Sequence, residues 1–330
     1  MRIAIDAMGG DQAPDKILQG AVESLEYLQN GDELILVGQE EAIRSRIGSV
    51  INGHSQVRIE PAAQVIGMDE SPVEAVRQKR DSSIVRMVKL AAAGSADAII
   101  SAGNTGALVA AGVLMLKPLP GVERPGIAVT IPTSEGFFML CDAGANIQPK
   151  PVHLYQYAIL ASIYSEAIWR VKNPRIGLLN IGTEEEKGTP LVKETRQLME
   201  KDKALHFVGY VEGRDLFNNV CDVVITDGFT GNVTLKIVEG LTGSLLKTFK
   251  SDTASLEPAL LAKVGPVLKK IQDRYDHEEY GGALLLGVSG LFLKVHGSSG
   301  AKAIRNAVRS VKETSKLNIN ERIASRLGPA

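Results

Sequence analysis

The chain has 330 residues, of which 44% are hydrophobic and 23% are charged, and its formal net charge is -1. This composition is typical of a globular protein with one large α/β core or two smaller domains. A charge balance so close to zero, without a long run of like charges, argues against generic nucleic-acid binding.

Strand-like and helix-like segments alternate through the first half of the chain. After the apolar run at the amino terminus, Pro14 suits a first helical position, and apolar residues from Ile17 to Leu28 recur at helical spacing. A helix-like run at Asn104–Leu116 follows the fourth apolar run. The predicted strands of this half are Arg2–Ala7, Glu33–Gly38, Val57–Ala62 and Ala96–Gly103.

The second half begins with two apolar runs, Gly126–Thr133 and Phe137–Ala143, joined by a polar turn at Ser134–Gly136. This spacing predicts an antiparallel hairpin within the sheet. Further strands are predicted at Pro174–Gly182, Leu205–Val211, Asp222–Asp227 and Leu291–His296. Helices are predicted around Pro151–Val171, Leu191–Lys201, Asn232–Lys250 and Ser299–Val311.

These elements predict a three-layer α/β/α fold. Apolar strands that alternate with helices and lack polar alternation are typical of a mainly parallel sheet covered on both faces. No internal repeat, low-complexity tract or Ser/Gly-rich linker divides the chain. We therefore expect a single domain over residues 1–330.

The segment 255–279 departs from this pattern. Its apolar residues share one face of a helical wheel, with lysines at the edges, and Gly265–Pro266 is expected to break the helix midway. The segment is therefore predicted to be a protruding amphipathic helical hairpin. It packs against the core or a second subunit, or it lies on an anionic membrane. The apolar residues expected to contact a membrane are Leu256, Leu260, Leu261, Val264, Val267 and Leu268.

Six loops rich in Gly, Ser, Thr, Asn and Asp follow strand-like runs. Loops after the carboxyl ends of strands line the ligand crevice of an open α/β sheet. Glycine allows close approach of the backbone, and helix N-termini offer free N–H groups and partial positive charge. We therefore expect an enzyme with a shared pocket that handles an anion. The loops are Met8–Asp11, Ser101–Gly106, Asp142–Asn146, Asn180–Gly188, Thr226–Asn232 and His296–Gly300.

Common cofactor and catalytic signatures are missing from the sequence. No GxGxxG follows the first strand, and in the Walker-like loop Gly182–Thr189 the lysine precedes the second glycine. Gly287–Gly290 lacks the last glycine of a nucleophile elbow, and the five histidines lack metal-ligand spacing. Cys141 and Cys221 lie in or beside apolar runs and outside any CxxC, so we interpret them as buried residues in a reducing compartment, with a catalytic thiol or a redox pair as the alternative. We expect neither a metal nor another cofactor.

The amino-terminal segment bears on cellular location. It has one arginine and an apolar run too short for a signal peptide. No uncharged apolar stretch reaches about 18 residues, the length that a spanning helix needs. We therefore expect a cytoplasmic protein.

Several loop residues suit the handling of phosphate or a carbonyl group. The ammonium of Lys187 could neutralise phosphate charge, although pairing with Glu184–Glu186 in solvent is the simpler alternative. Asn232 and Asn104 could donate to a carbonyl oxygen or only cap helices. His296 precedes an anion nest and could pass protons near neutrality, or it could be an ordinary hydrogen-bonded loop residue.

Eight motifs along the chain carry a family resemblance. They are DAMGGD at Asp6–Asp11, SAGNTGA at Ser101–Ala107, DAGAN at Asp142–Asn146, NIGTEEEKG at Asn180–Gly188, VEGRD at Val211–Asp215, TDGFTGNV at Thr226–Val233, YGGALLLG at Tyr280–Gly287 and KVHGSS at Lys294–Ser299. In this order they resemble the bacterial acyl-acyl-carrier-protein:phosphate acyltransferases of phospholipid synthesis (the PlsX type). Two departures are small: DAGAN stands where the family often has DVGAN, and HGSSG where HGSSD is common.

The resemblance implies a fold like that of the isocitrate/isopropylmalate dehydrogenase and phosphotransacetylase group, usually as a homodimer. It also implies the reaction, in which inorganic phosphate attacks the thioester of a fatty acyl group on acyl carrier protein. The products are acyl phosphate, which supplies phospholipid synthesis, and free carrier protein. Peripheral contact with the inner face of the cell membrane is implied as well, and the segment 255–279 is the candidate for it.

The matching motifs place the site. Asp227 is expected to orient Asn232 or Lys187 rather than act as a base. The expected catalytic residues are Lys187, Asn232, Asp227 and His296. The expected phosphate and substrate contacts are Gly9, Gly10, Asp11, Ser101, Gly103, Asn104, Thr105, Asn146, Asn180, Gly182, Gly228, Gly231, Gly297, Ser298 and Ser299. The expected contacts with the acidic carrier protein, in a stretch that is otherwise a solvated surface, are Arg77, Lys79 and Arg80.

The expected mechanism needs no covalent enzyme intermediate, because phosphate is already a nucleophile. Lys187 and the backbone at Ser298–Ser299 would hold phosphate, and Asn232, aided by Asn104, would donate to the thioester oxygen. His296 could protonate the leaving thiolate. Three alternatives stay open: a phosphotransacetylase that uses acyl-coenzyme A, a nicotinamide-dependent decarboxylating dehydrogenase, and a scaffold for lipid or carrier protein without activity.

Overall fold

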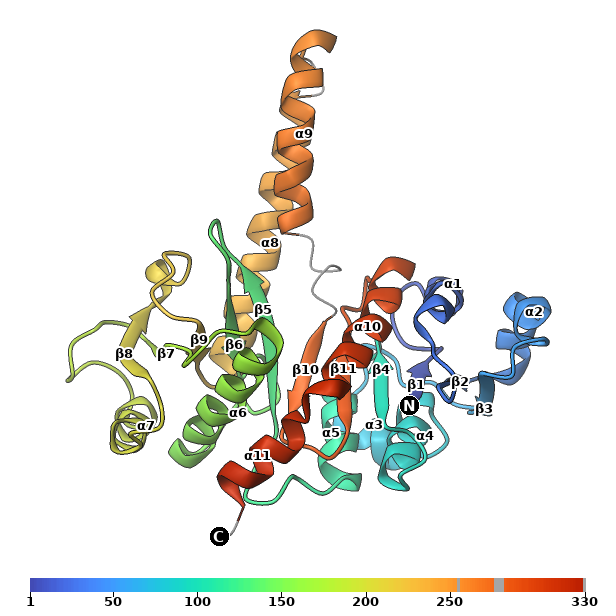
Figure 1. The fold of residues 1–330 in the computed structure, drawn as a ribbon, viewed down its shortest axis with the longest axis horizontal. Coiled ribbons are helices and arrows are strands. Elements are labelled where there is room, and N and C mark those ends of the chain that lie inside the picture. Colours follow the sequence, from blue (N-terminus) through green and yellow to red (C-terminus); the bar gives the residue numbers. More distant parts are fainter. Residues whose placement is uncertain (254–255, 276–281, 329–330) are drawn as a thin grey trace.

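The computed structural model describes residues 1–253, 256–275 and 282–328, and over these residues it contains one eleven-stranded sheet with helices on both faces (Figure 1). The strands are β1 (Arg2–Asp6), β2 (Glu33–Gly38), β3 (Val57–Pro61), β4 (Ala98–Ser101), β5 (Gly126–Pro132), β6 (Phe137–Cys141), β7 (Ile176–Asn180), β8 (Phe207–Glu212), β9 (Val223–Ile225), β10 (Ala283–Leu286) and β11 (Leu291–Lys294). The α-helices are α1 (Asp15–Glu23), α2 (Glu40–Ile51), α3 (Pro72–Gln78), α4 (Ser83–Ala92), α5 (Thr105–Met115), α6 (Pro151–Trp169), α7 (Pro190–Lys201), α8 (Gly228–Thr253), α9 (Pro258–Arg274), α10 (Ala301–Thr314) and α11 (Ile319–Leu327). Short 3-10 turns are Ser24–Tyr27, Gly213–Asp215 and Ser315–Leu317.

The sheet is mainly parallel, as predicted, and its strands follow the order β3-β2-β1-β4-β11-β10-β5-β6-β9-β7-β8. Among the described strands, the antiparallel pairs are β5 with β6, β5 with β10, and β10 with β11. The pair β5–β6 is the predicted hairpin. The strands β1 to β4 and β11 therefore run one way, and β6 to β9 run the other way. The sequence pattern did not predict β10 or α11, since β10 is only four residues long.

The hydrogen-bond register places one residue of every described strand in a single row across the sheet. This row consists of Ile59, Leu36, Ile5, Ile100, Leu293, Leu284, Ala128, Cys141, Ile225, Leu178 and Tyr210. Apart from β5, each of these strands ends at the row or at most two residues beyond it. The two groups of strands run in opposite directions, so their carboxyl ends lie at the row or extend past it on opposite sides. The six polar loops follow these carboxyl ends and therefore leave the row in two directions.

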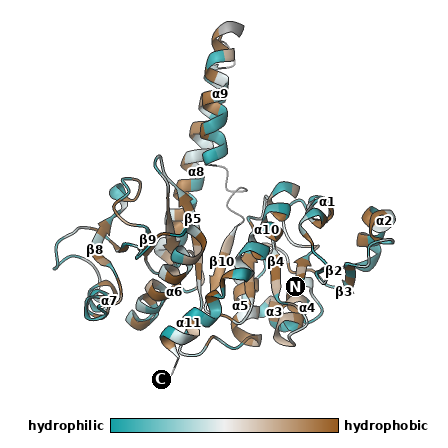
Figure 2. Ribbon diagram, viewed as in Figure 1, coloured by the Kyte–Doolittle hydropathy of each residue, from teal (hydrophilic) through white to brown (hydrophobic). Residues whose placement is uncertain are grey.

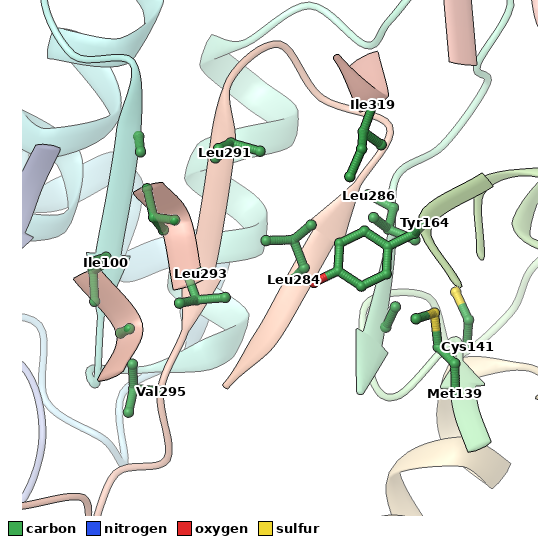
Figure 3. Close-up of a cluster of buried hydrophobic side chains, with 14 of the residues drawn as sticks. Ile100, Met139, Cys141, Tyr164, Leu284, Leu286, Leu291, Leu293, Val295 and Ile319 are labelled. Atoms are coloured by element: carbon green, nitrogen blue, oxygen red, sulfur yellow. The ribbon is translucent and has the colours of Figure 1, made fainter. Parts of the chain in front are cut away.

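Each face of the sheet has its own hydrophobic core. The row residues pack on the face covered by α1, α2, α6, α7, α10 and α11. Figure 3 shows part of this core, where Tyr164 of α6 lies beside Leu284 and Leu286, and Leu293 and Ile100 continue the core along the sheet. The other face is covered by α3, α4, α5 and α8. Because side chains alternate along a strand, the residue after each row position points toward this second face.

The helices α8 and α9 protrude together from the sheet, and hydrophobic and hydrophilic residues alternate along both (Figures 1 and 2). The predicted break at Gly265–Pro266 is wrong, because α9 continues through Pro266. An exposed helix tolerates the missing N–H donor, since water can bond to the carbonyl that loses its partner. The hairpin therefore starts at Gly228 and not at 255. Ser255 and residues 276–279 of the predicted hairpin lie outside the described residues.

No helix in the described part of the chain is long and apolar enough to cross a membrane.

Candidate functional site

Three buried polar side chains follow the row at neighbouring strand ends. Asp6, Ser101 and Lys294 are each at most 9% exposed and end β1, β4 and β11. The Ser101 hydroxyl donates to Asp6 Oδ2 at 2.7 Å, and the Lys294 ammonium donates to the carbonyl of Ala102 at 3.2 Å. Burial raises the pKa of Asp6 and lowers the pKa of Lys294 to about 8, while the attraction between the two charges opposes both shifts. The strand ends therefore place a buried charge pair beneath the loops.

Hydrogen bonds join the loop after β1 to the loop after β11, next to Asp6 and Lys294. The Asp11 N–H donates to the carbonyl of Gly297 at 2.8 Å, and the Gln12 side chain donates to the carbonyl of Ser298 at 2.8 Å. Gly9 lies against Asp6 so closely that an added Cβ would come within 2.3 Å of Asp6 Oδ2. A side chain at position 9 would therefore displace the carboxylate, which explains why a glycine stands there.

His296 meets two charged residues of α8. Its Nε2 lies 3.4 Å from Lys236 Nζ and 3.6 Å from Glu239 Oε2, and Lys236 Nζ lies 2.7 Å from the same carboxylate oxygen. The Ser298 N–H donates to Nδ1 at 3.3 Å, and the Ser298 hydroxyl lies 2.8 Å from it. Since a backbone N–H can only donate, Nδ1 is an acceptor, and the proton of the neutral ring lies on Nε2. The His296 ring therefore presents an N–H group to α8.

In the other group, the loop after β6 packs against the start of α8, where the Gly228 N–H donates to the carbonyl of Asn146 at 2.8 Å. Asp142 is fully buried and accepts hydrogen bonds from the backbone N–H groups of Ile127, Gly144, Ala145 and Asn146. The first turn of α8 passes close to this loop. A Cβ on Gly231 would come within 1.9 Å of the Asp142 carbonyl oxygen, so only glycine allows the approach.

Among the expected catalytic residues, Asn232 and Asp227 lie at the start of α8. The Asn232 side chain is exposed and lies beside Gly144. The Asp227 carboxylate accepts hydrogen bonds from the N–H and the hydroxyl of Thr230, at 2.9 and 2.7 Å, and so caps the helix. These contacts give Asp227 a structural task in addition to any role toward Asn232.

Lys187 lies on the same side of the row as Asn232, in the loop after β7. Its side chain is exposed, and the Asn180 amide holds the loop by donating to the carbonyls of Gly182 at 3.1 Å and Lys187 at 3.3 Å. The strand β9 lies between β6 and β7, so the loops after these three strands leave the sheet next to one another. The predicted loop neighbours are thus brought to one side of the row.

Asn104 has a different environment from that expected of an oxyanion donor. Its Oδ1 caps α5 by accepting from the Ala107 N–H at 3.0 Å. Its amide nitrogen donates to the carbonyls of Gly67, Met68 and Glu70 at 3.1 to 3.3 Å. The side chain therefore connects α5 to the loop before α3, and Thr105 begins α5 next to it.

Ser299 precedes α10 and is 1% exposed. Within the part of the chain that the structure describes, its hydroxyl has no hydrogen-bond partner. A buried hydroxyl without a partner is costly, and the N-terminus of α10 adds partial positive charge beside it. This loop therefore has unused hydrogen-bonding capacity near His296.

The expected carrier-protein contacts differ in exposure. Arg77 and Arg80 are exposed at the end of α3. Lys79 is half-buried, and its ammonium bonds to Glu70 at 2.5 Å and to the carbonyl of Val65 at 2.8 Å. Arg77 and Arg80 therefore keep their charges available at the surface.

Four charged residues of this region were not singled out from the sequence. Asp6 and Lys294 lie in the motifs DAMGGD and KVHGSS, but a strand end gives no sign of which side chain points inward. Lys236 and Glu239 read as an ordinary surface pair on a helix. Their spacing from Asn232 could have identified them, because Asn232, Lys236 and Glu239 lie on one face of a helix.

The two cysteines do not contribute nucleophiles. Cys141 and Cys221 are buried and unpaired as thiols. Burial raises the pKa of Cys141 well above its usual value and that of Cys221 to about 12. Since the thiolate is the reactive form, both thiols are inert in the folded protein.

A surface hollow of about 680 Å³ lies apart from these loops. It borders the ends of β2 and β3, with Gln39, Glu40, Asp81 and Arg86 in its lining. No residue expected to bind phosphate belongs to it. The candidate site is therefore the line of loops beside α8, and not this hollow.

Comparison with known proteins identifies a family. The model of a family described as "fatty acid synthesis protein" matches residues 1–322. A phosphate acyltransferase of Bacillus licheniformis is 45% identical over 322 residues, which cover 97% of this chain and 96% of that protein. One from Desulfitobacterium hafniense is 47% identical over 332 residues, which cover 99% and 98%.

Solved structures share the fold at low sequence identity. A phosphotransacetylase of Streptococcus pyogenes superposes with a TM-score of 0.61 at 18% identity, covering 96% of this chain and 94% of its own. A branched-chain phosphotransacylase of Enterococcus faecalis gives 0.56 at 16% identity, covering 95% and 98%. The predicted three-layer fold and its resemblance to the phosphotransacetylase group are therefore confirmed.

Proposed function

Because the chain belongs to the fatty acid synthesis protein family, we propose that it transfers a fatty acyl group from acyl carrier protein to inorganic phosphate, giving acyl phosphate for phospholipid synthesis. The observation that carries this proposal is the match over residues 1–322 together with nearly full-length relatives that are phosphate acyltransferases. The loops beside α8 suit the reaction, since they combine N–H groups, cationic side chains and a histidine.

The reaction needs positioning more than covalent catalysis. A phosphate oxygen forms a bond to the thioester carbon, the carbon–sulfur bond breaks, and the leaving thiolate takes up a proton. Asn232 donates to the thioester oxygen, which becomes negative in the tetrahedral intermediate. The neutral His296 ring cannot supply this proton, because it would become an imidazolate. A thiolate whose thiol has a pKa of about 8.5 leaves well unaided and takes its proton from solvent.

Phosphate is held by cations and backbone N–H groups. Lys187 supplies a cationic contact. The N–H groups of Ser298 and Ser299 donate to His296 in this structure, so they reach phosphate only when these bonds open. Asn104 supports the site indirectly, because its amide already donates to three carbonyls of the 67–70 loop. Asp227 fixes the start of α8 and with it Asn232.

The direct test incubates the purified protein with palmitoyl-acyl carrier protein, with and without inorganic phosphate. Free carrier thiol is followed, and acyl phosphate is trapped as its hydroxamate. Phosphate-dependent release of both products supports the proposal. Release from palmitoyl-coenzyme A alone would instead assign a phosphotransacetylase, and no release from either donor would leave a scaffold without activity.

Variants test the assigned residues in the same assay. We expect Lys187→Ala and Asn232→Ala to lower turnover on the order of 100-fold, because each removes a contact to charge in the transition state. Lys201→Ala, at the exposed end of α7, is the matched control and should keep full turnover. Turnover near that of the unaltered protein in a folded Lys187 or Asn232 variant would refute the role.

We also propose a homodimer and a peripheral membrane contact, both through the α8–α9 pair. Apolar residues of α8 are exposed at every fourth position, and a second copy of the chain would cover them. Leu260, Leu261 and Val267 of α9 are 40 to 58% exposed and carry the proposed contact with anionic lipid, while Leu256, Val264 and Leu268 are half-buried. The exposed residues of α8 are Phe229, Val233, Ile237, Leu241, Leu245 and Phe249.

A further inference from the structure

Glu239 occupies the space between two groups that suit an anion. One carboxylate oxygen, Oε2, lies 2.7 Å from Lys236 Nζ and 3.6 Å from His296 Nε2. The ring proton of His296 lies on Nε2, so an ammonium and an N–H group both face the same carboxylate. An internal anion therefore already occupies this position.

The charges around this position do not favour a second anion. The charges that act on the Lys294 ammonium are those of Asp6, Asp11 and Glu239, which are three carboxylates, and that of the Lys236 ammonium. Phosphate, with one or two negative charges, gains net attraction here only if one carboxylate withdraws.

Glu239 is the carboxylate that can withdraw. Asp6 is 1% exposed and is held by Ser101 and by the backbone N–H of Met8. The Glu239 side chain is 31% exposed and is on a protruding helix, from which it can rotate into solvent. Burial acts to raise its pKa, but the hydrogen bonds from His296 and Lys236 hold the pKa at about 2, so the carboxylate stays charged at neutral pH.

We propose that Lys236 and His296 contribute to the inorganic-phosphate site in addition to Lys187, and that the Glu239 carboxylate occupies their position in the free enzyme and is displaced when phosphate binds. This inference rests on the proposed function, because it assigns a site to the phosphate of that reaction. Lys236 is then a binding residue. Glu239 sets the phosphate concentration at which the site fills, and it keeps Lys236 and His296 occupied between turnovers.

The test measures phosphate binding without an acyl donor, so it does not depend on the acyl-transfer reaction. Inorganic phosphate is titrated at constant ionic strength, balanced with potassium chloride, and binding is followed by calorimetry. Glu239→Gln keeps the shape of the side chain and removes its charge. We expect it to bind phosphate on the order of tenfold more tightly, because a unit charge a few ångströms from the anion is removed from a partly buried site. Lys236→Met should bind at least tenfold more weakly.

The chain offers a matched control on the neighbouring helix. Lys269 and Asp273 of α9 form an exposed ion pair at 2.6 Å. Asp273→Asn and Lys269→Met make the same charge changes away from the site and should leave phosphate affinity unchanged. Unchanged or weaker binding by Glu239→Gln would show that Glu239 positions the site instead of blocking it. Unchanged binding by Lys236→Met would place phosphate elsewhere.

The acyl-transfer assay separates this inference from the proposed function. If phosphate affinity changes as expected but no acyl phosphate forms from any donor, the site stands and the reaction is wrong. If acyl phosphate forms while Glu239→Gln leaves the KM for phosphate unchanged or raised, the reaction stands and the displacement is wrong.

Discussion

Asp32 connects three distant parts of the chain through one buried carboxylate. It accepts hydrogen bonds from the amino-terminal ammonium of Met1 at 3.0 Å and from the Gln29 N–H at 2.6 Å, and it pairs with the ammonium of Lys312 in α10. Burial acts to raise its pKa, but these partners lower it to about 2. The carboxylate therefore stabilises the folded state through its charge.

We predict that Asp32→Asn destabilises the protein by roughly 2 to 4 kcal/mol near neutral pH, because it leaves the buried ammonium of Lys312 without its counter-ion. The folded pKa is depressed, so this contribution is complete above the unfolded value near 3.8 and is lost as the pH falls through about 2. Urea denaturation at several pH values measures it. The difference between Asp32→Asn and the unaltered protein should shrink below pH ~4.

A second aspartate provides the comparison. Asp15 pairs with Arg46 at the surface, and its side chain is 70% exposed. Exposed ion pairs contribute little, so Asp15→Asn should change the free energy of unfolding by less than about 1 kcal/mol. Equal effects of the two substitutions would contradict the structural importance given to Asp32.

Single residues also show how far the sequence predicts the site. The loops and their polar residues were identifiable, because glycine and asparagine mark turns at strand ends. Asn104 was identified as a candidate donor, but its amide nitrogen donates to three backbone carbonyls. These carbonyls belong to a loop far away in the sequence, so local sequence does not reveal them. Asp6 and Lys294 were missed, since only the register shows that they point to one face.

At the level of elements, apolar periodicity predicts where helices occur better than it predicts which helices pack together. The apolar periodicity indicates both α8 and α9 but predicts them as separate units, with a turn at Gly265–Pro266 that the structure does not have. Helix α8 begins at Gly228 because Asp227 caps it and two glycines permit its close approach to the 142–146 loop. Apolar periodicity detects neither the cap nor the close approach, so it predicts the start of the helix too far along the chain.

The α8–α9 pair separates two proposed contacts, and a pair of substitutions distinguishes them. We expect Leu260→Glu to release the protein from anionic liposomes in a flotation assay while turnover in solution persists. Leu241→Glu should give monomers by light scattering. Gln272→Glu adds the same charge to the exposed polar side of α9 and should change neither property. Loss of dimers in Leu260→Glu, with liposome binding retained, would assign α9 to the subunit interface.

For the whole molecule, sequence reasoning predicted the layers but not their alignment. Apolar strands alternating with helices indicated a covered, mainly parallel sheet. The row that runs from Ile59 to Tyr210 depends on hydrogen bonds between strands far apart in sequence, which no local pattern encodes. As a result, the six loops were expected in one pocket, whereas they leave a common line in two directions, and α8 joins both groups.

Association with the acidic carrier protein also concerns the whole surface. We predict that Arg77→Glu with Arg80→Glu slows association with acyl carrier protein and weakens its salt dependence, because both exposed charges contribute to electrostatic steering. Stopped-flow kinetics over a range of salt concentrations measure both. Lys172→Glu, near the end of α6, is the control for a change in net charge. Unchanged rate and salt dependence in the double variant would reject this docking surface.

The burial of both cysteines has a practical consequence for the measurements. The chain contains two thiols, at most 3% exposed, and the folded protein should therefore not react with a thiol reagent added to detect carrier protein. Thiol released in the assay then comes from the carrier alone, without a blank correction for the enzyme. The same reagent reports unfolding, because both cysteines react only when the sheet comes apart.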